Sequence, residues 1–108
     1  MANKHRGEIE AEIGGARRRL VLTLGALAEL EAAFGAEDLV ALAERFDSGR
    51  LKAQDLIRII GAGLRGAGEN ITDEDVARMN IAGGAPGYAR VAAELIAATF
   101  DGDAGQGG

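Results

Sequence analysis

The fold is decided near the N-terminus, where residues 7–21 have the sequence GEIEAEIGGARRRLV. From Ile9 to Ile13 apolar residues alternate with glutamates, and this period of two is typical of a strand with one buried face. Gly14 and Gly15 then tolerate the positive φ angles that a two-residue hairpin turn requires. The stretch therefore predicts a β-hairpin.

A turn at these glycines fixes which residues of the two strands face each other. Glu12 is placed opposite Arg17, and Glu10 is placed opposite Arg19. Cross-strand pairs of opposite charge stabilise a hairpin by about 0.2–1 kcal/mol each, so these two arginines have a structural role that requires no ligand. Arg18 falls on the apolar face, where it must extend outward to solvent or find a partner.

The residues after the hairpin predict an α+β fold, in which the two-stranded hairpin is followed by about five short helices that form a small bundle. Thr23 suits the N-cap of the first helix. Thr72 and Asp75 form a T-x-x-D capping box for the fourth, with Ile71 and Val76 as its hydrophobic staple. The predicted parts are an N-terminal arm at 1–6, a single globular domain at 7–100 with the hairpin at 7–22 and helices at about 24–34, 37–47, 53–65, 73–80 and 86–100, and a disordered tail at 101–108.

Apolar residues at helical spacing predict which side chains form the core of the bundle. The leucines and isoleucine expected there rather than at an interface are Leu24, Leu27, Leu39, Leu56 and Ile60. The edges of the hairpin and the alanine-rich faces of the first and last helices remain as exposed surfaces for contacts with other chains.

Composition excludes several classes of function. The chain of 108 residues has a net charge of −5, no cysteine and one histidine. Disulfides, thiolate nucleophiles and the usual catalytic triads are therefore ruled out, and an acidic chain on average repels nucleic acid. No apolar run is long enough to span a membrane, and we expect a cytoplasmic protein that has no membrane partner.

Two motifs that resemble ligand sites are better explained by structure. The glycine-rich segment at 61–68 lies at the end of a predicted helix, whereas a phosphate loop precedes a helix, so helix termination or close helix packing is expected. Asp73, Glu74 and Asp75 do not match a calcium loop and suit the first turn of a helix. We therefore expect no catalytic site, cofactor or metal, and hence no enzyme.

The order of these features resembles a known family. The segments are LTLGALAELE at 22–31, L-x-x-L-x-x-R-F at 39–46, DLI at 55–57 and TDEDV at 72–76. Together they resemble the small tail protein encoded in the gene transfer agent clusters of alphaproteobacteria, a relative of phage tail assembly chaperones that is also labelled a tail tube protein. The resemblance covers about residues 3–100. Lys52 departs from it, because a Ser or Thr cap is expected before the third helix.

This resemblance implies a non-enzymatic assembly factor that binds the tail tube protein or the tape measure protein in the bacterial producer cell. A structural tail component that is retained in the particle is one alternative, and a small nucleic-acid-binding regulator is another. A homo-oligomer formed through the hairpin edge or a helical face is also considered. The residues predicted to make contacts with partners are Arg17, Arg18, Arg19, Val21, Glu29 and Tyr88.

Overall fold

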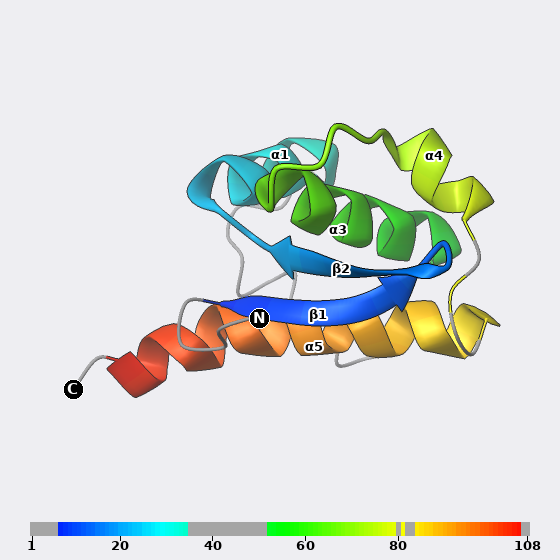
Figure 1. Cartoon of the computed structure of the whole chain (residues 1–108). Coiled ribbons are helices and arrows are strands. Elements are labelled where there is room, and N and C mark those ends of the chain that lie inside the picture. The colour runs from blue at the N-terminus through cyan, green and yellow to red at the C-terminus, as the bar shows by residue number, and fades with distance from the viewer. Residues whose placement is uncertain (1–6, 35–51, 80, 82–83, 107–108) are drawn as a thin grey trace.

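The computed structural model describes residues 7–34, 52–79, 81 and 84–106. Within these ranges, an antiparallel hairpin is followed by four helices, where the sequence predicted about five (Figure 1). The elements are β1 (Glu8–Ile13), β2 (Ala16–Val21), α1 (Leu24–Phe34), α3 (Ala53–Gly66), α4 (Asp73–Arg78) and α5 (Gly84–Gln106). The α+β fold is confirmed, while the arm predicted at 1–6 and the helix predicted at 37–47 lie outside the described residues.

The hairpin has the predicted register. Glu12 faces Arg17 across the strands, and Ile13 faces Ala16 at the turn. Gly14 and Gly15 have φ angles of 65° and 83°, a backbone conformation that glycine adopts without the steric cost of a Cβ. Beside the turn, Ile13 forms an isolated antiparallel bridge with Ile81, which fastens the end of β1 to the segment before α5.

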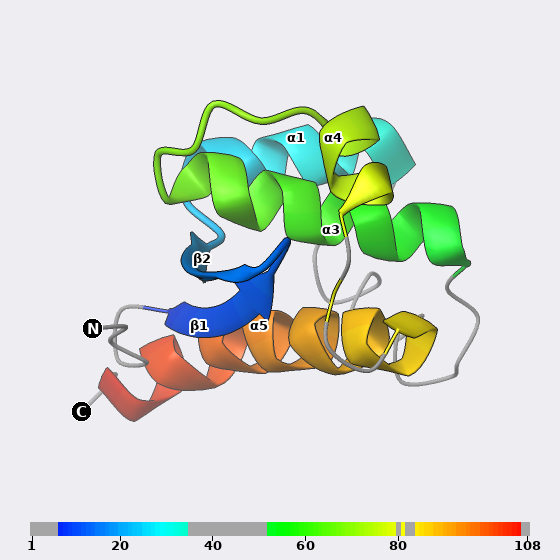
Figure 2. The ribbon, with the colours of Figure 1, turned by 45° about the vertical axis from the view of Figure 1, so that its right-hand side comes forward.

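Helix α3 lies at the centre of the molecule. It packs against β2, α1, α4 and α5. Figures 1 and 2 show α3 and α5 running beside the hairpin, with α1 on the side of α3 away from α5. Every residue from Ile59 to Leu64 is buried, as expected for a helix that is covered on all sides.

Glycines on α3 allow the neighbouring elements to approach this closely. A Cβ at Gly61 would overlap the carboxylate of Asp73 on α4, and a Cβ at Gly63 would lie 2.6 Å from a methyl group of Leu95 on α5. A Cβ at Gly66 would overlap the carbonyl oxygen of Val21. Close packing, one of the two explanations proposed from the sequence, therefore accounts for these glycines, although α3 also ends at Gly66.

Hydrogen bonds at the helix ends explain where α1 and α4 begin. The hydroxyl oxygen of Thr23 accepts a bond of 3.1 Å from the backbone N–H of Ala26. At α4 the predicted capping box is confirmed, because Thr72 Oγ1 accepts from the Asp75 N–H and Asp75 Oδ2 accepts from the Thr72 N–H, each at 3.1 Å. Ile71 is also buried, as a staple residue should be.

Both ends of α3 are also fixed by local bonds. The lysine that departs from the family pattern cannot cap through an ammonium group, yet the backbone N–H of Lys52 donates to Asp55 Oδ2 at 2.9 Å. At the other end, the N–H of Gly68 donates to the carbonyl of Arg65 and the N–H of Glu69 donates to that of Leu64, each at 3.0 Å. These two bonds form a Schellman motif, with Gly68 at a φ of 101°.

Two sequence predictions about the helices are wrong. Leu24, expected in the core, is 84% exposed. As the first residue of α1 it lies roughly 140° around the helix from the stripe that contains Ala26 and Leu30, which are buried. Helix α5 continues to Gln106 rather than ending at Phe100, so residues 101–106 belong to a helix and not to the predicted disordered tail. Extension of an existing helix costs little, and no proline interrupts it there.

The remaining helix boundaries lie within a few residues of the predicted ones, and the other described residues predicted for the core are buried or partly buried. Helix α4 ends at Arg78, and α5 begins at Gly84, two residues before the predicted start. Ile60 is fully buried, and Leu27 and Leu56 are partly buried against the core. The last of the predicted core leucines, Leu39, lies outside the described residues.

Gly66→Ala is expected to destabilise the fold by about 1–3 kcal/mol, because the added methyl group would overlap the backbone oxygen of Val21, which cannot rotate away. Gly25→Ala is the matched control, since the nearest atom to its Cβ would be Thr23 Oγ1 at 3.8 Å. The control should stabilise α1 by roughly 0.4–1 kcal/mol. Urea unfolding of both variants measures the difference, and equal effects of the two substitutions would contradict the packing explanation.

The capping box predicts a pH dependence of stability. Hydrogen bonds from the backbone and side chain of Thr72, and then from Arg78, lower the pKa of Asp75 from its usual 3.8. Because this pKa is lower in the folded chain, the ionised carboxylate stabilises the fold above pH 3.8 and loses its effect as the pH falls through the lowered value. Asp75→Asn should therefore lower the melting temperature at pH 7 and do so less at pH 3. Glu74→Gln, in the same helical turn, is the control.

Candidate interaction surface

The hairpin presents one face to solvent, and the register determines which side chains lie on it. In a two-residue hairpin the residues that face the helices alternate with those that face outward. The inner residues Ile9, Ile13 and Leu20 are buried. The outer face consists of Glu8, Glu10, Glu12, Arg17, Arg19 and Val21.

Ion pairing on the outer face is diagonal rather than directly across the strands. Glu12 and Arg17 are cross-strand neighbours, as predicted, but Arg17 donates to Glu10 Oε1, from Nη2 at 2.8 Å and from Nε at 3.3 Å. This hydrogen bond raises the pKa of Arg17 and lowers that of Glu10. The side chain of Arg17 is 65% exposed, so the pair adds little to stability.

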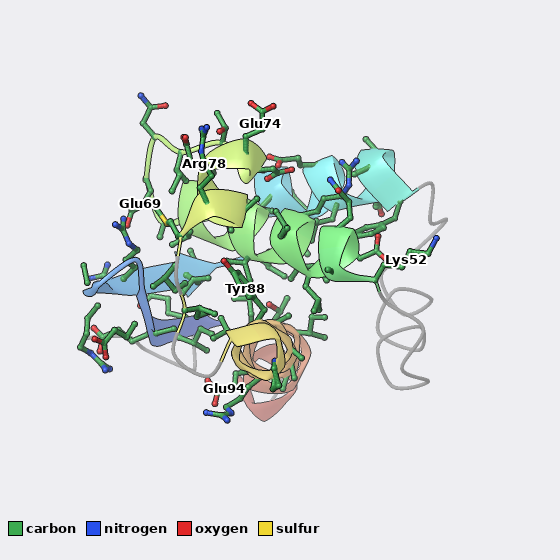
Figure 3. The ribbon with its side chains drawn as sticks, turned by 90° about the vertical axis from the view of Figure 1, so that its right-hand side faces the viewer. Lys52, Glu69, Glu74, Arg78, Tyr88 and Glu94 are labelled. Carbon is green, nitrogen blue, oxygen red and sulfur yellow. The ribbon has the colours of Figure 1, made fainter. Side chains whose placement is uncertain are left out.

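Arg18 points inward and holds the hairpin to the helical part of the chain. Its Nε donates to the carbonyl of Ile13 at 2.9 Å, and its Nη1 donates to Glu69 Oε1 at 2.9 Å. The side chain is only 22% exposed. Glu69 follows directly from the Schellman motif of α3, and Figure 3 shows it on the hairpin side of the molecule. Of the two outcomes expected for Arg18, solvent or a partner, the structure shows a partner, Glu69 in the segment between α3 and α4.

Glu29 also makes a contact within the chain, to an arginine that joins three elements. Arg65 on α3 donates to Glu29 on α1 through Nη2, and its Nη1 donates to the carbonyl of Ile71 at 3.1 Å. The same Nη1 lies 3.0 Å from Asp73 Oδ1. This oxygen is buried without a well-directed hydrogen bond among the described residues. The pKa of Arg65 is raised, first by the hydrogen bond that it donates to Glu29.

Tyr88 connects α5 to the end of α4. Its hydroxyl group lies 2.9 Å from the carbonyl oxygen of Val76 and 2.7 Å from that of Met79, and it acts as the donor to them. Burial raises the pKa of this phenol. Figure 3 shows Tyr88 reaching from α5 towards α4. The polar atom of Tyr88 is thus engaged within the chain, although the ring also borders an open pocket.

The structure divides the six predicted contact residues into two groups. Arg17, Arg19 and Val21 lie on the outer face, whereas Arg18, Glu29 and Tyr88 hold elements of the same chain together. The alternation along β2 indicates this division for the three arginines. The three consecutive arginines therefore do not form one basic patch, since their side chains lie on two faces of the hairpin and two of them pair with glutamates.

A pocket that sequence reasoning missed opens at the opposite end of the bundle from the C-terminal end of β2. It has a volume of about 280 Å³ and is almost entirely apolar. Its lining comes from the first turns of α3 and α5, the end of α4 and the segment between them: Ala53, Leu56, Ile57, Ala77, Met79, Ile81, Gly84 and Tyr88. Leu56 and Ile57 are consecutive apolar residues, so the apolar surface of α3 is wider here than a single helical stripe. This was the local sequence signal for the pocket.

The alanine-rich helix faces differ in exposure. On α1, Ala28, Ala32 and Ala33 are exposed, as expected of a contact surface. On α5, Ala92 and Ala98 are buried in the core. Of the two predicted helical surfaces, α1 is thus the more accessible.

The described residues contain no cluster of histidine and carboxylate side chains that could hold a metal ion. None of the helices among them combines the length and hydrophobicity of a membrane span. A model of the family described as "Phage tail tube protein, GTA-gp10" matches residues 6–102. The chain belongs to this tail tube protein family. No match was found among curated proteins or among solved structures.

Membership of the GTA-gp10 family confirms the resemblance stated from the sequence and identifies the chain as a phage-like tail protein. The description of the family names a tail tube protein and no enzymatic activity. Surfaces that contact other tail proteins are therefore the functional features to identify, and the outer face, the apolar pocket and the exposed side of α1 are the candidates among the described residues.

Arg18→Met is expected to destabilise this GTA-gp10 family member by about 1–3 kcal/mol, because it leaves Glu69 and the Ile13 carbonyl without their donor. Arg19→Met removes the same charge from the exposed outer face and should change stability by less than about 0.5 kcal/mol. Thermal unfolding of the two variants tests this assignment. An Arg19 variant as unstable as the Arg18 variant would contradict it.

Proposed function

We propose that the protein is a non-enzymatic tail assembly factor that binds the tail tube protein or the tape measure protein through the outer face of the hairpin. The observation that carries this proposal is the composition of that face: it has three glutamates, two arginines and a single apolar residue, the partly exposed Val21 at the end of β2. Permanent interfaces are mostly hydrophobic, whereas a charged surface suits a partner that binds and then leaves.

The position of the hairpin supports the same proposal. Its inner face is buried on α3 and α5, the Arg18 pair fixes it to the segment after α3, and the Ile81 bridge fixes the turn end of β1. A face held in this way loses little conformational freedom on binding. Its charges would speed up encounter with a tail partner of complementary charge and make the complex sensitive to salt. Such binding would take place in the cytoplasm of the producer cell.

A structural tail component is the second candidate, favoured by the description of the family as a tail tube protein. The two functions differ in whether the protein stays with the particle. An assembly factor should be absent from purified particles or far below stoichiometric amounts, whereas a structural component should be present at a fixed ratio to the other tail proteins. Quantitative mass spectrometry of purified particles separates the two.

Capture from a producing culture tests the proposed binding face. The wild-type chain should retain the tail tube or tape measure protein, and Arg17→Glu combined with Arg19→Glu should reduce the captured amount at least tenfold. Arg90→Glu, the same type of substitution at one exposed position of α5, is the control and carries half of the charge change. Thermal unfolding verifies that each variant is folded. Equal capture by the double variant and the control would show that the outer face is not the binding surface.

A further inference from the structure

We infer that copies of this chain associate head to tail, with Leu24 of one copy inserted into the apolar pocket of the next. Leu24 is the one large hydrophobic side chain exposed among the described residues. A Cβ at the neighbouring Gly25 would have only Thr23 Oγ1 within 4 Å, so the space around the start of α1 is open. An exposed apolar side chain of this kind is stabilised by any site that removes it from water.

The pocket has the size and the lining to receive this side chain. An apolar cavity of about 150 Å³ can hold a benzene molecule, which has more carbon atoms than a leucine side chain. The pocket is larger, at about 280 Å³, and it is open to solvent. Small residues, Ala53, Ala77 and Gly84, form part of its lining and leave room for the end of an incoming helix.

Leu24 and the pocket lie at opposite ends of the same molecule. The hairpin turn is at the pocket end, where Gly14 faces Met79 and Ile13 bridges to Ile81. From there β2 runs its six residues away from the pocket, roughly 17 Å, before α1 begins at Leu24. Figure 1 shows α1 starting at the end of the molecule that is remote from α4. One copy cannot fill its own pocket, so the occupant is a second copy.

Charges beside the two sites are complementary. Glu31 is exposed two turns after Leu24 on the same face of α1. Lys52 is exposed directly before the pocket residue Ala53, and Figure 3 shows it at the start of α3. A copy that approaches the pocket with α1 thus brings a carboxylate to a surface that carries an ammonium group.

The contact joins two different surfaces, so it is heterologous. Such contacts leave a free site at each end of a pair and build rings or open rows rather than closed dimers. Burial of one leucine offsets only part of the freedom lost on association, so single contacts are weak and become populated where copies are concentrated. This geometry suits a protein that works in a repetitive tail, and it does not depend on which tail component the outer face binds.

Disulfide trapping tests the contact directly, because the chain has no native cysteine. Gly25→Cys combined with Ala77→Cys places one thiol beside Leu24 and one in the pocket lining, and Gly25 has room for the added side chain. Mild oxidation should give a ladder of dimers, trimers and longer chains on a non-reducing gel. A mixture of the two single-cysteine variants should form the mixed dimer but no longer chains, because each copy carries one thiol.

Background substitutions at Leu24 make the test specific. Leu24→Asp should reduce the ladder at least fivefold, whereas Leu24→Met should retain it. Leu24 is exposed, so neither change should alter the far-ultraviolet circular dichroism or the melting temperature. Gly25→Cys with Arg19→Cys is the control pair for random collision. A ladder as strong in the Asp background or in the control pair would overturn the inference, and neither result bears on capture of a tail partner through Arg17 and Arg19.

Discussion

The structure depends on the close approach of four elements to one helix. Residues 59–64 of α3 are buried on every side, and this is possible only because glycines stand where neighbours come nearest. Gly61 faces α4, Gly63 faces α5 and β2, and Gly66 faces the end of β2. Glycine weakens a helix by about 1 kcal/mol relative to alanine, so the packing that it permits must offset that cost. Without it, a hairpin of two strands would have no stable support.

The same constraint explains why the hairpin presents a defined face. β2 rests against α3, and the Schellman motif at the end of α3 turns the chain so that Glu69 meets Arg18. The inner face is thus fixed by apolar burial and by one partly buried ion pair, whereas the pair of Arg17 with Glu10 on the outer face is exposed. Charges on the outer face are therefore available to a partner at little cost to the fold.

Local signals in the sequence predicted local structure well. The period of two and the glycine pair gave the hairpin register, and Thr23 and Thr72 marked the starts of their helices, because each feature depends on residues close together in the chain. Contacts between distant residues had no such signal. Arg65 and Glu29 are 36 residues apart, and Arg18 and Glu69 are 51 apart, so only the packing of α3 brings them together. This is why the sequence could name Glu29 and Arg18 but not their partners.

Leu24 shows where helical periodicity alone fails. Leu24, Leu27 and Leu30 are regularly spaced along α1. The angle at which α1 meets α3 nevertheless decides which side of this row of residues is buried. The helix is rich in alanine and leucine almost all round, so periodicity could not identify its exposed side. A helix of that composition is normally buried on all sides. That α1 leaves Leu24, Ala28 and Ala32 exposed to water along one side is the physical reason why we propose this side of the molecule for contact with another chain.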